Sequence, residues 1–183
     1  MPARPKLRLD VVAGGREPIQ IGAFDVYIAP STHPPFIPDT QVFEEDTALL
    51  TSAPAVIRES TEHPIRLLTD TVFQSLYPVG SVITRTRKRW LAVVYDFEAD
   101  PICNEEWSHT AWTGLFQHAK RYGVRTLATP LLGISLSSIP LPALADGFID
   151  AIDSDLTPLR RIWLVTPATQ CQPLRDILLQ RIA

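Results

Sequence analysis

Apolar positions in this chain fall into short runs that are separated by turns rich in proline and glycine. Runs with many β-branched and aromatic residues predict strands at residues 7–12, 19–23, 25–29, 79–84, 90–97, 124–129 and 161–166. The run at 90–97 is apolar without interruption over most of its length, which is typical of a strand at the centre of a sheet.

Helical spacing of apolar residues predicts helices at 43–51, 64–76, 105–122, 141–150 and 173–182, whereas 53–60 is ambiguous. Asn104 is a suitable N-cap and Gly123 a suitable stop for the longest helix, and Pro173 suits the first turn of the last one. Strands come first and then alternate with helices. The predicted fold class is therefore α/β, a three-layer α/β/α domain with a mixed central sheet, and residues 1–183 form a single domain.

The segment 124–141 carries the strongest chemical signal. A strand breaks at Pro130 and Gly133, a loop of small hydroxyl residues follows, and a helix begins near Pro140. Backbone N–H groups in such a loop can converge on a phosphate, and the helix dipole favours negative charge there. The candidate ligand-binding residues are Gly133, Ile134, Ser135, Leu136, Ser137, Ser138 and Ile139. The alternative is a serine-capped helix entry, in which Ser137 or Ser138 accepts from otherwise free N–H groups.

A second candidate group follows the strand at 25–29. Ser31 and Thr32 lie at a strand end, where α/β proteins place ligand contacts, and His33 could act as a general base. A lone histidine among prolines can equally well be just exposed. Asp96, Glu98 and Asp100 could bind a ribose or a metal, or could simply lead the chain into solvent.

Bulk composition narrows the possible partners. The net charge of −3 argues against bulk electrostatic binding to nucleic acid, and the basic run at 85–89 is interpreted as a solvated hairpin connection. Two cysteines are too few for a disulfide framework and lack zinc-ligand spacing. No apolar run approaches the ~20 residues of a membrane span, and the first residues lack a signal-peptide core. We expect a cytoplasmic protein with no cofactor, metal, nucleic-acid or membrane partner; the oligomeric state stays open.

The second half of the chain resembles a macro domain, the module that binds ADP-ribose and related nucleotides. The resemblance rests on a buried strand, a long helix ending at Gly123, the Pro130-Leu131-Leu132-Gly133 turn and Ile139-Pro140-Leu141 at the helix entry. In the first half, Asp25-Val26-Tyr27-Ile28 resembles the family's Asp-containing strand before its first ligand loop. The resemblance implies binding of ADP-ribose, or of an ADP-ribosylated protein, and leaves ADP-ribosyl hydrolase activity open.

The chain also departs from the family pattern. The family's catalytic asparagine would fall at Thr32, no glycine occurs between Gly22 and Gly80, and serines replace glycines in the second loop. The catalytic residues are therefore unknown. The alternative function is a divergent macro-like fold that binds no ligand and acts as a protein-interaction or assembly module.

Overall fold

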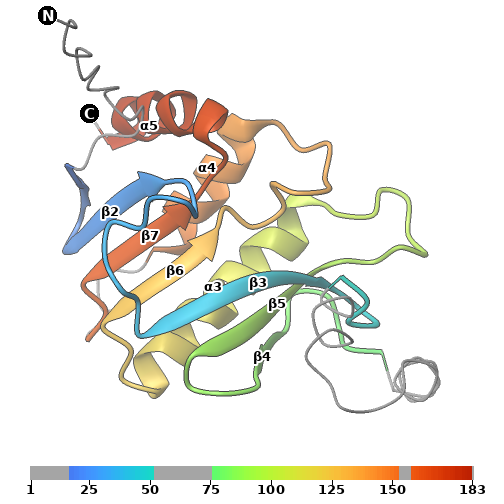
Figure 1. The fold of residues 1–183 in the computed structure, drawn as a ribbon. Helices are drawn as coiled ribbons and strands as arrows, with labels where there is room; N and C mark the ends of the chain where they lie inside the picture. The colour runs from blue at the N-terminus through green and yellow to red at the C-terminus, as the bar shows by residue number, and fades with distance from the viewer. Residues whose placement is uncertain (1–16, 52–75, 153–157, 183) are drawn as a thin grey trace, which may run out of the picture.

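The computed structural model describes residues 17–51, 76–152 and 158–182. The predicted strand at 7–12, the ambiguous stretch at 53–60 and nearly all of the predicted helix at 64–76 lie outside the described residues. Within them, seven strands form one mixed sheet in the order β1-β2-β7-β6-β3-β5-β4 (Figure 1). The strands are β1 Ile19–Ile21, β2 Phe24–Ala29, β3 Thr40–Asp46, β4 Val82–Thr84, β5 Arg89–Tyr95, β6 Thr126–Pro130 and β7 Arg161–Val165.

The five inner strands β2, β7, β6, β3 and β5 run parallel, and β1 and β4 pair antiparallel at the two edges. The carboxyl ends of the parallel strands therefore lie along one edge of the sheet. In α/β proteins, ligands bind outside this edge. The mixed sheet predicted from the sequence is confirmed.

Three helices cover one face of the sheet: α3 Glu105–Arg121, α4 Leu141–Ala151 and α5 Ala168–Ile182 (Figure 1). Their apolar stripes and the sheet face form one cluster, centred on the fully buried Trp112, Phe116 and Phe148. Two smaller clusters lie on the opposite face, around Trp163 and around Leu91 with Val93. The predicted three-layer fold has helices on both faces of the sheet. Among the described residues, helices occur on the face covered by α3, α4 and α5.

The ends of α3 follow local sequence signals. The side chain of Asn104 accepts a hydrogen bond from the Trp107 N–H at 2.9 Å, as expected of an N-cap. At the other end Gly123 has φ +65°, a conformation that glycine adopts without a side-chain penalty. Both predicted ends of this helix are confirmed.

The predicted helix at 43–51 is wrong, because this region contains the end of β3. Val42 packs into the helix-covered core and Phe43 against the opposite cluster, so side chains alternate between the two faces. β3 also pairs in parallel with both β5 and β6. Hydrogen bonding to two distant strands outweighs the local helical pattern.

The start predicted for the last helix is also wrong, since α5 begins at Ala168 and contains Pro173 in its interior. Proline there removes one helical hydrogen bond. Cys171, Leu174 and Leu178 nevertheless form a buried stripe with spacings of three and four residues. Burial of this apolar stripe stabilises the helix enough to offset the hydrogen bond lost at Pro173.

Candidate functional site

The loop after β6 begins with a tight turn. Ile134 N–H donates to the Leu131 carbonyl at 2.9 Å, and Gly133 has φ +97°. A Cβ at Gly133 would lie 3.0 Å from Cδ2 of Leu144 on α4, so the backbone here also packs closely against the helix. Both the dihedral angle and the packing explain why glycine occupies this position.

Several N–H groups of the loop already have partners. The Gly133 N–H donates to Oε1 of Glu44, and the Leu136 N–H donates to the Tyr95 hydroxyl at 3.2 Å. The Ser137 N–H donates to the Gly133 carbonyl at 3.2 Å. Groups of the protein itself therefore occupy these donors, and the binding of a ligand's phosphate here stays a prediction.

Ser137 stabilises the loop rather than capping the following helix. Its hydroxyl donates to the Gly133 carbonyl at 2.6 Å and accepts from the Ile139 N–H at 3.3 Å. The N-cap of α4 is Pro140, which makes no side-chain cap hydrogen bond. The alternative of a serine-capped helix entry is therefore wrong for α4, because the serine bonds fall within the loop.

Glu44 is the central group of this site. It lies near the end of β3, next to β6 in the sheet, and is 8% exposed. Burial raises the pKa of its carboxyl group, and this effect exceeds the opposing one of hydrogen bonds from Ser135, Gly133, Tyr95 and Ile134. A carboxylate therefore sits where the sequence predicted a ligand's phosphate.

Two neighbouring groups respond to Glu44. Burial and the charge of Glu44 raise the pKa of the Tyr95 hydroxyl, which therefore stays protonated and can donate to the carboxylate. The same two causes raise the pKa of the Cys103 thiol to about 11, so this cysteine is a poor nucleophile at neutral pH. The raised pKa values show that burial at this site disfavours the charged form of all three groups.

This burial predicts a specific pH dependence of stability. The pKa of Glu44 is higher in the folded protein than its ordinary value of 4.5, so the folded state binds this proton more tightly than the unfolded chain. The free energy of unfolding should therefore fall as pH rises from about 4.5 through the folded-state pKa. Urea unfolding of the wild type and of Glu44→Gln at a series of pH values measures this. The fall should be smaller in the variant; identical pH profiles would contradict the assignment.

Ser31 and Thr32 lie at another strand end. Both are exposed after β2, which β7 separates from β6 in the sheet. The Thr32 hydroxyl is 2.9 Å from Nδ1 of His33, and the His33 N–H donates to the Pro30 carbonyl at 3.0 Å. They share the carboxyl edge with the Gly133 loop, and their ligand role remains a prediction.

A third loop at this edge follows β3, and the sequence analysis missed it. The Asp46 carboxylate accepts from the N–H groups of Ala48, Leu50 and Thr51 at 2.7–2.8 Å and from the Thr51 hydroxyl at 2.9 Å. Leu49, between these donors, has φ +57°. Glu44 and Asp46 were missed because the segment was interpreted as a helix, on which charged residues face solvent. Three consecutive carboxylates, at positions 44 to 46, after the apolar pair Val42-Phe43 were the available signal.

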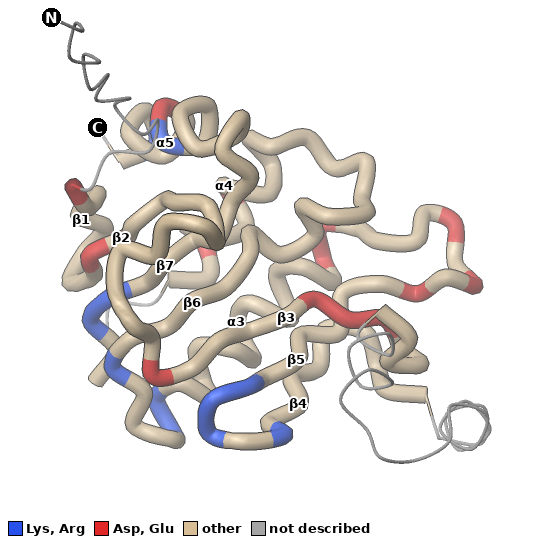
Figure 2. The backbone as a smooth tube through the Cα atoms, viewed as in Figure 1, with Lys and Arg blue, Asp and Glu red and all other residues tan. Residues whose placement is uncertain are grey.

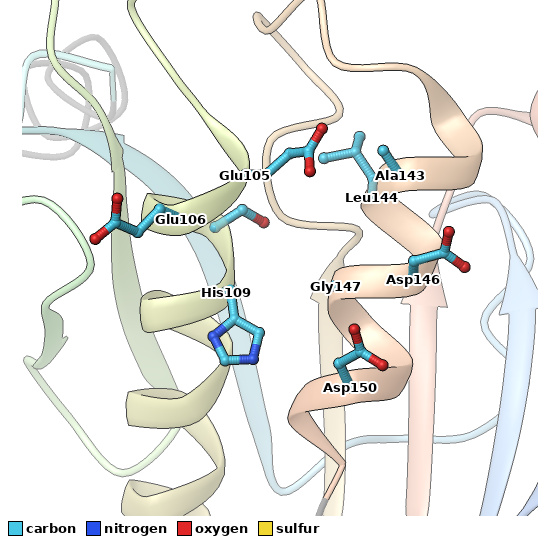
Figure 3. Close-up of a pocket in the computed structure, with 9 residues that line it drawn as sticks. Glu105, Glu106, His109, Ala143, Leu144, Asp146, Gly147 and Asp150 are labelled. Carbon is cyan, nitrogen blue, oxygen red and sulfur yellow. The ribbon is translucent and has the colours of Figure 1, made fainter.

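Two surface cavities lie beside the loop, and both are rich in carboxylates. One, of about 320 Å³, lies between α3 and α4, where Glu105, Glu106 and His109 line it from α3 and Asp146 and Asp150 from α4 (Figure 3). The other, of about 500 Å³, extends past Glu105 and Glu106 to Ser138 and Pro140. Their negative charge makes them unsuited to a phosphate. Within 17–51, 76–152 and 158–182, no cluster of three or more metal-ligating side chains occurs.

Among the helices in the described part of the chain, none is both long and apolar enough to cross a lipid bilayer.

The fold is that of the macrodomains. A macrodomain of Oceanobacillus iheyensis solved with ADP matches with a TM-score of 0.61 at 14% identity, over 90% of this chain and 97% of that one. A Trypanosoma brucei macrodomain in complex with ADP-ribose matches with a TM-score of 0.55 at 11% identity, over 91% and 74%. The macro domain of ganglioside induced differentiation associated protein 2 gives 0.58 at 11% identity, over 93% and 94%. No family model and no curated protein matches the sequence.

Proposed function

We propose that this chain binds ADP-ribose or a related nucleotide at the carboxyl edge of the sheet, where the Gly133–Ile139 loop receives the phosphates once the Glu44 carboxylate is displaced. The observation that carries the proposal is the hydrogen bond from the Gly133 N–H to Glu44. Donors of this loop already hold an oxyanion, which belongs to the protein itself. A phosphate offers more acceptor oxygens than a carboxylate and suits the same donors.

The fold supports the proposal at a coarser level. Two of the similar structures are described as macrodomains with ADP or with ADP-ribose. In this chain the loop lies outside the carboxyl ends of parallel strands, the usual place for ligands in such sheets. Ser31 and Thr32, exposed at the same edge, are proposed as further contacts to the ligand.

Thermal melting tests the proposal. ADP-ribose that binds only the folded state should stabilise it by about 2.7 kcal/mol at a hundredfold excess over its dissociation constant. Ser138→Asp should reduce this shift by placing a negative charge at the loop, because Ser138 is exposed there. Thr169→Asp is the matched control, with the same added charge at an exposed position on α5. Equal shifts in both variants would place the ligand elsewhere.

The finer part of the proposal is hydrolysis of an ADP-ribosyl bond. A base that activates water would be needed, and the exposed Thr32–His33 pair is the candidate at this edge. The measurement is release of free ADP-ribose from an ADP-ribosylated protein, with His33→Ala as the comparison. Release that is unchanged in this variant would exclude His33 as the base.

A second candidate function is a protein-interaction or assembly module that binds no nucleotide. The observation that favours it is that Glu44, Tyr95 and Ser137 already pair with donors of the loop. A loop satisfied in this way needs no ligand for its stability. Absence of a melting shift with ADP-ribose, ADP and NAD, together with a multimeric elution profile, would support this candidate.

A further inference from the structure

Basic side chains gather at the amino edge of the parallel strands, opposite the proposed nucleotide site. Figure 2 shows Lys and Arg segments along this side of the sheet, with a few Asp and Glu segments among them, whereas the ends of β3 and β5 on the other side lead into Asp and Glu. The exposed members of the basic edge are Arg85, Arg87, Lys88, Arg125, Arg160 and Arg161.

Backbone hydrogen bonds place these residues in a row across the sheet, which Asp39, just before β3, interrupts. The Gln41 N–H donates to the Lys88 carbonyl at 2.9 Å, which joins the β4–β5 connection to β3. The Arg160 N–H donates to the Arg125 carbonyl at 2.9 Å, which joins the segment before β7 to the start of β6. Since β5, β3, β6 and β7 are successive neighbours, the row extends about 15 Å across the sheet.

Little negative charge opposes this row among the described residues. Oδ2 of Asp39 accepts from the N–H groups of Arg125 and Thr126, both at 3.0 Å, and Asp25 is half-buried. Glu98 follows the carboxyl end of β5, and Glu105 and Glu106 form the first turn of α3.

An exposed aromatic ring lies beside the row. Tyr122, at the end of α3, is 45% exposed, and the Arg121 guanidinium lies 5.7 Å from its ring centroid. Its other neighbours are Trp90 and His118, at ring centroid distances of 5.8 and 6.1 Å. An exposed ring of this kind can stack on an unpaired base once the Arg121 guanidinium, which lies over it, moves to a phosphate.

We propose that this basic edge binds single-stranded nucleic acid, with the phosphates along the row from Lys88 to Arg161 and a base on Tyr122. The cations are mostly arginines, whose planar guanidinium groups form paired hydrogen bonds with phosphate. The exposed ring favours unpaired bases over an acidic protein surface, which has no planar rings in regular order. The inference stands apart from the proposed nucleotide site, which lies at the other edge.

Fluorescence anisotropy with a labelled oligouridylate or oligothymidylate tests this proposal. The logarithm of the association constant should fall linearly with the logarithm of the salt concentration, with a slope of roughly −0.7 for each phosphate neutralised. Arg125→Glu should lower the affinity and make the slope shallower, because the side chain is exposed and the hydrogen bonds that Arg125 makes to Asp39, Arg160 and Arg161 use its backbone groups. Tyr122→Leu should lower the affinity roughly tenfold while leaving the slope unchanged.

Arg181→Glu near the end of α5 is the control, because it makes the same change in net charge at a side chain that pairs with Asp146 and is not part of the row from Lys88 to Arg161. Its affinity should stay near that of the wild type. Equal losses in Arg125→Glu and Arg181→Glu, or no binding at low salt, would overturn the proposal. Tight binding of polyglutamate or of duplex DNA, together with no effect of Tyr122→Leu on oligonucleotide affinity, would also overturn it. In that case the edge would recognise negative charge and not unpaired bases. Melting curves of each variant verify that it is folded.

Discussion

Glu44→Ala should bind ADP-ribose at least roughly tenfold more tightly than the wild type, a gain of about 1.4 kcal/mol. In the wild type the ligand must displace a carboxylate that holds the Gly133 N–H, and it brings negative charge close to that carboxylate. Two charges about 4 Å apart near a protein surface interact by about 4 kcal/mol, so a tenfold change is a conservative expectation. Isothermal titration calorimetry measures the affinities directly.

The controls separate charge from shape. Glu44→Gln keeps the size of the side chain and removes its charge, so its affinity should fall between those of the wild type and of the alanine variant. Glu98→Ala removes an exposed carboxylate beyond β5 and should leave the affinity nearly unchanged. Equal affinities of the wild type and Glu44→Ala would show that Glu44 does not compete. If neither of them binds, the loop is not a nucleotide site and the interaction module remains.

Asp46→Ala should lower the free energy of unfolding by about 3 kcal/mol. The 1% exposed Asp46 carboxylate accepts four hydrogen bonds from the loop that follows β3. Each bond to a charged acceptor contributes about 1.5–3 kcal/mol, and the sum is reduced because the four share one group. Leu49 in that loop has φ +57°, a strained conformation for a residue with a side chain. Without the hydrogen bonds to Asp46, fewer interactions hold the loop in this conformation.

Urea unfolding measures this difference. Asp46→Asn retains one acceptor oxygen and should lose about half as much stability as the alanine variant. Asp150→Ala, at an exposed position near the end of α4, should change stability by no more than about 0.5 kcal/mol. A loss in Asp46→Ala as small as that of Asp150→Ala would mean that water replaces the carboxylate without cost.

Together the two acidic residues explain the arrangement of the carboxyl edge. Glu44 engages the loop after β6, and Asp46 engages the loop after its own strand. β3 thus connects to both loops through side chains two residues apart. Sequence reasoning identified the first loop from its glycine and serines, but not the strand that supplies the carboxylates.

Local signals were sufficient for elements whose ends depend on neighbouring residues. Asn104 and Gly123 bound α3 because capping and a positive φ involve only residues within one turn. The apolar run around residues 90–95 predicted β5 for a similar reason, since its length and composition suit a strand buried on both faces. Gly133 marked the turn after β6, where φ +97° requires glycine.

The sequence by itself determined the mixed α/β fold, the long helix and the turn at Gly133, because periodicity, caps and glycine positions depend on adjacent residues. Only the tertiary structure decided that residues 40–46 form a strand, since its partners on β5 and β6 lie far along the chain. It also decided that Glu44 meets Gly133 and that Lys and Arg residues from distant segments gather at one edge of the sheet. The physical reason is the same in each case: hydrogen bonding and charge act between groups that only the assembled sheet brings together.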